Sequence, residues 1–92
     1  MPGARAPPII GAMPRFVLHH RHEAHECARA YAAWKGFASP LRQKTAASSC
    51  VEGGHEIWWI VLADEAEAAL ALLPSYVARR TDAIAIREVK IP

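Results

Sequence analysis

This sequence contains only two cysteines, which is too few for a fold held together by several disulfide bonds. Cys27 and Cys50 are far apart in the chain, and neither belongs to a C-x-x-C pair. Two such residues do not make the disulfide framework of a small secreted domain, so free thiols in a reducing cytoplasm are expected. A single Cys27–Cys50 bridge is the alternative.

The chain also lacks a long apolar segment and a block of like charge. No run approaches the roughly 20 apolar residues that cross a bilayer, and the proline-rich residues 1–14 lack the apolar core of a signal peptide. Eleven basic and nine acidic residues give a net charge of +2, spread along the chain. Neither a membrane nor nucleic acid is therefore an expected partner. Residues 1–14 are predicted to be a disordered tail, followed by one domain, residues 15–92.

Apolar periodicity predicts six elements in that domain. They are a strand over 15–22, a helix over 23–36, a hairpin of two strands over 44–63, a helix over 64–80 and a strand over 83–91. Gly36 is expected to end the first helix, and Gly53-Gly54 to form a two-residue hairpin turn. Asp64 is expected to cap the second helix, and Pro74 to kink or restart it.

This order predicts an α+β fold of the ferredoxin-like βαββαβ type. In that fold two helices cover one face of a four-stranded antiparallel sheet, and the other face stays open. A chain this short buries only about 60% of its unfolded surface, so help from a partner or a metal is expected. A second copy covering the open face would give a sheet-to-sheet homodimer.

The chain resembles the small ferredoxin-like proteins that pair as dimeric α+β barrels. That group includes cofactor-free monooxygenases, polyketide cyclases, haem-degrading enzymes and actinobacterial nickel-binding proteins. The resemblance covers residues 15–92 and rests on element order, length, the first-strand histidines and the aromatic third strand. It implies a homodimer that binds a metal ion or a small molecule. Haem-degrading members place their iron-binding histidine late in the chain, whereas no histidine follows His55 here.

Four of the five histidines gather where the first strand gives way to the helix. Imidazole and thiolate are the usual protein ligands of zinc, nickel and copper. Alternation along a strand puts His19 on one face and both His20 and His22 on the other, so the three cannot all bind one ion. The segment H-E-A-H, residues 22–25, is one residue short of the metalloprotease motif H-E-x-x-H, and a protease is not predicted.

The third strand and the hairpin supply further candidate ligands. If Trp58, Ile60 and Leu62 face the helices, the open face carries Cys50 and His55 beside His19. Arg21 would then be an anion partner and Trp59 an apolar wall, while Cys27 is assigned to the core by its place on the helix stripe. The candidate metal ligands are His19, His20, His22, Cys50 and His55.

Three classes of function fit these residues. The leading hypothesis is a dimeric carrier, sensor or store of a transition metal, either nickel, zinc or copper. The second is a small dimeric-barrel enzyme, such as a cyclase, isomerase or cofactor-free monooxygenase. It would use a histidine as general base in an apolar pocket walled by Trp59 and by Tyr31 or Tyr76. The third is a structural or regulatory dimer whose histidines point to solvent.

Overall fold

The computed structural model describes residues 14–92. Along the chain it contains β1 (Arg15–Arg21), a 3₁₀ turn η1 (Ala24–Glu26), α1 (Cys27–Ala32), β2 (Ala47–Ser48), β3 (Glu56–Leu62), α2 (Ala66–Leu70), α3 (Ser75–Ala78) and β4 (Thr81–Ile86). The disordered tail predicted for residues 1–14 lies outside the described residues, apart from Pro14.

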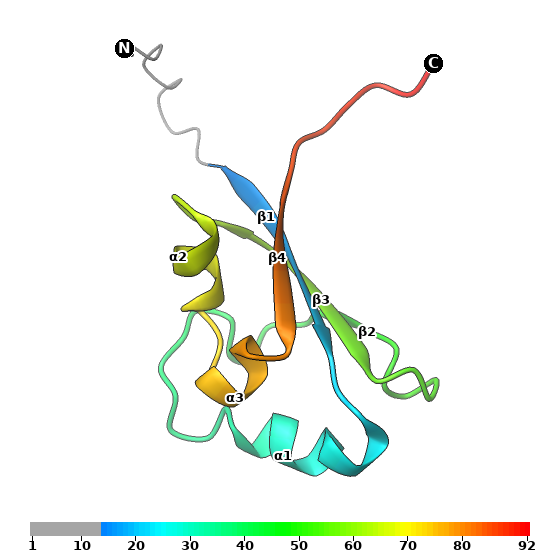
Figure 1. Cartoon of the computed structure of the whole chain (residues 1–92), viewed down its shortest axis with the longest axis vertical. Coiled ribbons are helices and arrows are strands. Elements are labelled where there is room, and N and C mark those ends of the chain that lie inside the picture. Colours follow the sequence, from blue (N-terminus) through cyan, green and yellow to red (C-terminus); the bar gives the residue numbers. More distant parts are fainter. Residues whose placement is uncertain (1–13) are drawn as a thin grey trace.

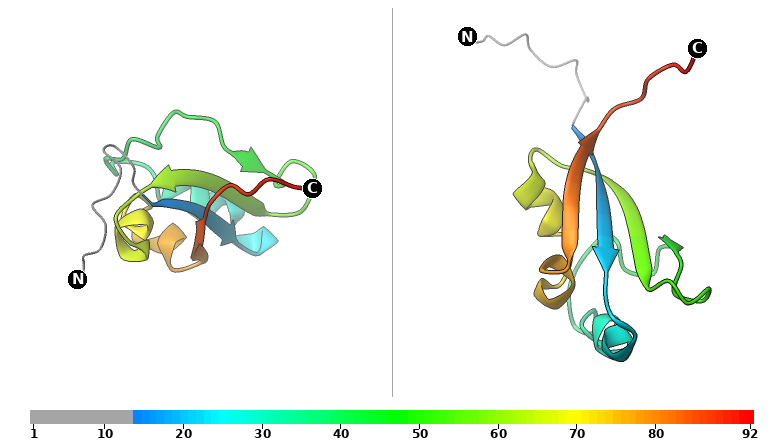
Figure 2. Two further views of the ribbon diagram at one scale, coloured as in Figure 1. Left: turned by 90° about the horizontal axis from the view of Figure 1, so that it is seen from above. Right: turned by 45° about the vertical axis from the view of Figure 1, so that its right-hand side comes forward.

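The four strands form one antiparallel sheet in the order β2-β3-β1-β4. The prediction of an α+β fold with such a sheet is confirmed, and the strand order is compatible with the ferredoxin-like arrangement. β1 pairs with β3 along its whole length, from Arg15 opposite Leu62 to Arg21 opposite Glu56. α2 and α3 pack beside β1 and β4, and α1 lies at the end of the molecule where β1 finishes (Figure 1 and Figure 2).

The hydrophobic core lies between the helices and one face of the sheet. Phe16 and Leu18 of β1 are buried there with Val61 of β3, and Leu73 and Val77 from the second helical region cover them. Each such side chain contributes about 1.5–3 kcal/mol when it is removed from water, so this face of the sheet sets the register. Every second residue of β1 is buried, as its alternating pattern predicts.

The predicted orientation of the third strand is wrong. Trp58, Ile60 and Leu62 were expected to face the helices, but Ile60 and Leu62 are 66% and 57% exposed on the open face. Leu18, fully buried among the helices, lies opposite Trp59, and directly opposed residues share a face. Trp59 therefore packs against the core rather than on the open face.

The predicted hairpin is also wrong in its register. A two-residue turn at Gly53-Gly54 would place Ser48 opposite Trp59, but Ser48 lies opposite Ile57, and β2 is only two residues long. The connection is a loop over residues 49–55 instead of the two-residue turn at Gly53-Gly54.

Ser49 closes this longer loop. Its backbone N–H donates to the Glu56 carbonyl (2.8 Å), its carbonyl accepts from the Gly54 N–H (2.8 Å), and its hydroxyl accepts from the Glu56 N–H (3.1 Å). A short hydroxyl side chain that satisfies nearby backbone groups competes with continued strand pairing. Gly53 at φ 91° and His55 at φ 56° complete the reversal.

The helices are shorter than their patterns predict. Gly36 has the expected positive φ of 76°, but α1 already ends at Ala32, so Gly36 ends the turn that follows the helix and not the helix itself. The N-cap of α2 is Glu65, without a side-chain hydrogen bond, so the predicted capping by Asp64 is wrong. Pro74 precedes α3 and restarts the helix, as predicted. No helix among the described residues is long and apolar enough to cross a membrane.

The last strand is displaced from its predicted range of residues 83–91. It begins at Thr81 and ends at Ile86. After Ile86 the large apolar residues shift from even to odd positions in the sequence. Residues 87–92 continue away from the sheet, at the end of the molecule opposite α1 (Figure 1).

Candidate metal centre

Two histidines and two cysteines meet at the α1 end of the sheet. His22 follows β1, Cys27 is the first residue of α1, Cys50 lies in the hairpin loop and His55 precedes β3. One ligand atom from each lies within 4.8 Å of the others. The backbone positions the histidines, because the His22 N–H donates to the His55 carbonyl (3.2 Å) and so extends the β1–β3 pairing beyond the strand ends.

The spacing of these atoms is close to that of a tetrahedral site. Zinc binds histidine nitrogen at about 2.0–2.1 Å and thiolate sulfur at about 2.3 Å, so tetrahedral ligand atoms are separated by about 3.3–3.8 Å. His22 Nε2 and Cys50 Sγ are already 3.8 Å apart. The largest separation, 4.8 Å, needs a contraction of about 1 Å.

A chain of hydrogen bonds sets which nitrogen of His22 faces this group. Nδ1 of His20 lies 3.1 Å from the Thr81 hydroxyl oxygen and 3.3 Å from the Val77 carbonyl. Because the Thr81 hydroxyl donates its own proton to that carbonyl (2.7 Å), both oxygens act as acceptors for His20 Nδ1, so this nitrogen carries the proton. Nε2 of His20 is then an acceptor, and Nδ1 of His22, 2.8 Å away, donates to it. The remaining nitrogen of His22, Nε2, keeps its lone pair and faces Cys50. A partner that fixes the tautomer in this way is the usual second layer of a metal site.

Burial favours the neutral form of the His20 and His22 imidazoles. It lowers the pKa of His20 below 6.5, and the neighbouring His22 lowers that pKa further. Burial also lowers the pKa of His22, with a further contribution from His55. A neutral imidazole is the form that binds a metal ion.

His55 provides a second sign that the group has a missing partner. Its Nδ1 is buried and has no hydrogen-bond partner among the described residues. Leaving such an atom unsatisfied costs about 1–3 kcal/mol. His55 also has a positive φ. This backbone conformation is energetically unfavourable for any residue other than glycine, and residues that adopt it cluster at functional sites.

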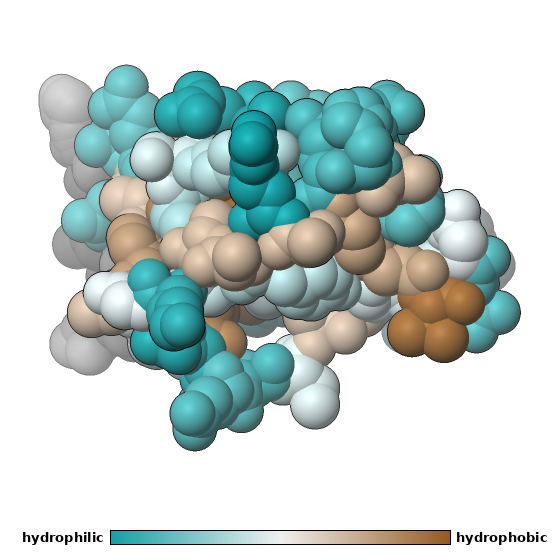
Figure 3. All heavy atoms as spheres, turned by 90° about the horizontal axis from the view of Figure 1, so that it is seen from below, coloured by the Kyte–Doolittle hydropathy of each residue, from teal (hydrophilic) through white to brown (hydrophobic). Residues whose placement is uncertain are grey.

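The surroundings of the group are polar and open to solvent. A surface depression of about 710 Å³ is lined by His22 and His55 together with Glu26 and Arg80. Arg80 Nη2 lies 3.0 Å from the Glu26 carboxylate, which ties η1 to the end of α3. Hydrophilic side chains cover much of this end of the molecule (Figure 3). An ion bound here would exchange with solvent without passing through the core.

The structure brings together three of the five predicted ligands. His22, Cys50 and His55 belong to the group, and His20 lies behind His22 as its hydrogen-bond partner. His19 lies on the open face, where its ring stacks on Trp58 at 5.2 Å between centroids, and it cannot reach the other four.

Cys27 was assigned to the core and instead joins the group, half-buried. The helix pattern starts at Glu23, but residues 24–26 form a 3₁₀ turn, which alters the side that Cys27 presents. The clustering of His22 and Cys27 in the sequence was the signal that could have identified it.

Beside the group, a cavity of about 360 Å³ is lined by Tyr31 and Trp59, the walls expected of an enzyme pocket. Interaction with the neighbouring Cys50 raises the pKa of the Tyr31 hydroxyl, so Tyr31 connects this cavity with the group. No described histidine lines this cavity, so it lacks the general base that the enzyme hypothesis requires.

Comparisons with protein-family models, with curated proteins and with solved structures found no match for this chain.

Proposed function

We propose that this protein binds a transition-metal ion through His22, Cys27, Cys50 and His55, and that zinc is the ion. The convergence of the four ligand atoms within 4.8 Å carries the proposal. Two imidazoles and two thiolates in a tetrahedral set favour zinc, whereas divalent nickel and copper prefer planar or tetragonal arrangements.

The four protein ligands would leave no open position on the ion. A closed site of this kind is structural or serves to hold the metal, since a catalytic zinc keeps one position for water or substrate. The ion would join the first strand, α1, the hairpin loop and β3 in a small domain. Its place beside the solvent-filled depression suits an exchangeable ion, so we assign the protein to metal storage, delivery or sensing.

Elemental analysis of untagged protein tests this function. One equivalent of zinc is expected, and Cys27→Ser, Cys50→Ser, His22→Ala and His55→Ala should each lower the bound metal and abolish the rise in melting temperature on adding zinc. Cobalt substituted for zinc should give the visible bands of a tetrahedral ion and near-ultraviolet charge transfer from thiolate. Two matched controls, His19→Ala on the open face and His25→Ala on the exposed turn, should keep full occupancy.

The proposal would be overturned if the native protein contained no metal and its melting temperature did not change on addition of zinc, nickel or copper. Equal loss of metal in the His19→Ala control would overturn the assignment of the ligands.

We also infer that two copies pair through the open face of the sheet. Ile60, Leu62 and Ile84 are 66%, 57% and 48% exposed, and all three lie on that face. The same face carries charges of both signs, among them Arg21 and Asp82. A surface with apolar and mixed charged residues can complement itself about a two-fold axis, which favours a second copy as its cover.

A further inference from the structure

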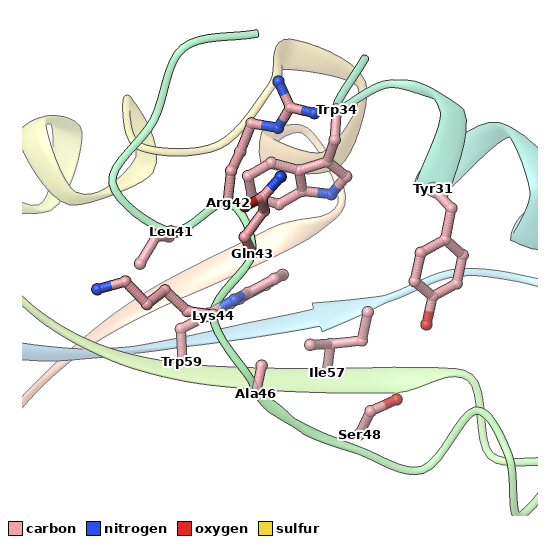
Figure 4. Close-up of a pocket in the computed structure, with 10 residues that line it drawn as sticks. All are labelled: Tyr31, Trp34, Leu41, Arg42, Gln43, Lys44, Ala46, Ser48, Ile57 and Trp59. Carbon is pink, nitrogen blue, oxygen red and sulfur yellow. The ribbon is translucent and has the colours of Figure 1, made fainter. Parts of the chain in front are cut away.

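A cavity beside the metal centre has a size and lining suited to a small organic molecule. Its volume is about 360 Å³, within the range of ligand pockets. It lies between the α1 region, the loop over residues 41–46 and the helix-facing side of β3 (Figure 4). The cavity forms because β2 is only two residues long, so a loop stands away from the sheet where a longer strand would pair.

The walls of the cavity are aromatic and rigid. Trp34 and Trp59 lie with ring centroids 5.9 Å apart at 48°, and Tyr31 forms the wall at one end. Ile57, which is buried, contributes to the floor. Aromatic walls offer a large apolar area and favour a flat ring as the guest.

The lining is positively charged. Arg42 and Lys44 are exposed at the cavity, and no aspartate or glutamate lines it. Among the described residues neither forms an ion pair, and the only hydrogen bond of the Arg42 side chain is a long one, 3.5 Å, to the Phe37 carbonyl. Gln43, between them, sits at φ 63°, and the Arg42 and Lys44 side chains leave this turn of the loop in different directions (Figure 4). Their charge is thus available to an anion.

We propose that this cavity binds a small aromatic carboxylate. The ring would lie against Trp34 and Trp59, and the carboxylate would bind Arg42 and Lys44, as guanidinium and ammonium groups bind carboxylates. Figure 4 shows Lys44 and Tyr31 at opposite ends of the cavity, so the hydroxyl of Tyr31 and that of Ser48 would accept or donate to a polar group on the far side of the ring. The site needs no metal ligand, and the proposed zinc site adjoins it only at its Tyr31 end, through Cys50.

Binding of 2-naphthoate to the full-length protein, followed by tryptophan fluorescence and by NMR, tests the proposal. Its uncharged counterpart 2-naphthamide and the non-aromatic cyclohexanecarboxylate serve as matched probes. Saturable binding of 2-naphthoate is expected, about tenfold tighter than that of either probe, because both the charge and the ring contribute. The NMR shifts should centre on Trp34 and Trp59.

Two variants locate the site. Arg42→Gln combined with Lys44→Gln should weaken 2-naphthoate about tenfold and leave 2-naphthamide unchanged, since only the charged contact is lost. Ala46→Phe should fill the cavity and abolish binding of both, with the circular dichroism unchanged. Arg79→Gln combined with Lys90→Gln removes the same charge elsewhere and should bind as the wild type does.

Equal affinity for 2-naphthoate and 2-naphthamide would overturn the proposal, as would wild-type binding by the Ala46→Phe variant or an equal loss in the Arg79→Gln, Lys90→Gln control. The His22→Ala variant should still bind 2-naphthoate, which separates this site from the metal centre.

Discussion

His20 lies behind the candidate metal centre and would set the tautomer of one of its ligands. Its Nε2 accepts a hydrogen bond from the His22 Nδ1–H, which leaves His22 Nε2 free as a ligand. Leucine at position 20 would fill a similar buried volume but could not accept the hydrogen bond from His22 Nδ1. His22 could then carry its proton on Nε2, the nitrogen that should bind the metal. The His20→Leu variant should bind zinc about 10–100-fold more weakly, in the range found when such second-layer partners are lost. Competition with a chelator measures this change.

The His20→Gln variant is the matched control for this tautomer effect. Its amide oxygen can accept from His22, so it should recover most of the zinc affinity. A His20→Leu variant that binds zinc as tightly as the wild type would show that the tautomer chain has no role.

Glu26 makes the fold sensitive to acid. The Glu23 backbone N–H (2.9 Å) and then the Arg80 guanidinium lower the pKa of the Glu26 carboxyl to about 2. A carboxyl whose pKa is lowered by folding contributes stability above its unfolded pKa, near 4.5, and that stability is lost as the pH falls through about 2.

In chelator-treated protein, the free energy of unfolding of Glu26→Gln should therefore lie below that of the wild type at pH 6. The difference should shrink as the pH is lowered toward 2. Urea unfolding at several pH values measures it, and Glu67→Gln, an exposed residue of α2, is the matched control. A constant difference between Glu26→Gln and the wild type at every pH would contradict this assignment.

At the level of elements, the alternation along each strand predicted which residues share a face. On β3, however, it did not predict which of the two faces is buried. On β1 the alternation was decisive, because the face with Phe16 and Leu18 contrasts with a face that carries Arg15, His19 and Arg21. On β3 both alternating sets are apolar, so hydrophobicity alone could not decide between Trp58 and Trp59. Pairing with β1 decides it, and that is a tertiary contact.

The hairpin loop explains why the candidate site was only partly predicted. Gly53-Gly54 is a strong turn signal in a sequence, yet the hydrogen bonds of Ser49 make a longer loop. That loop moves Cys50 and His55 out of the strand register and toward His22. A sequence gives little indication that a serine will bond to nearby backbone groups. Cys50 and His55 were therefore predicted as ligands, but the side of the sheet on which they lie was not.

Gly54 should be the most sensitive position of this loop. A Cβ at Gly54 would lie 2.4 Å from Ser49 Oγ and 2.8 Å from its Cβ, which forces the closing residue to move. Gly54→Ala should destabilise the protein by about 1–3 kcal/mol, the usual cost of overpacking, and should weaken zinc binding because Cys50 and His55 shift. Urea unfolding with and without a chelator separates the two effects.

The neighbouring glycine provides the comparison. A Cβ at Gly53 would meet nothing within 4 Å, and asparagine tolerates its positive φ, so Gly53→Asn should cost less than Gly54→Ala. The reverse order of stability would show that Ser49 does not close the loop.

For the whole molecule, the two proposed sites and the proposed dimer interface lie on different surfaces. The metal centre is at the α1 end, the cavity is on the helix-facing side of β3, and the exposed apolar residues lie on the open face of the sheet. A dimer formed through the open face would leave both sites accessible. It would also enclose the stacked pair His19–Trp58, and these two residues would then contribute to assembly rather than to metal binding.

Ile60 tests this arrangement because it lies on β3 in the open face and is 66% exposed. Wild-type protein should sediment as a dimer at micromolar concentration, and Ile60→Asp should sediment as a monomer, since an unpaired charge buried in an interface costs several kcal/mol. The variant should retain one equivalent of zinc, because the metal centre lies within a single chain.

Val51→Asp introduces the same charge at a residue that is 94% exposed in the hairpin loop, and it should remain a dimer. A monomeric wild type, or an Ile60→Asp variant that still dimerises, would overturn the assignment of the open face as the dimer interface.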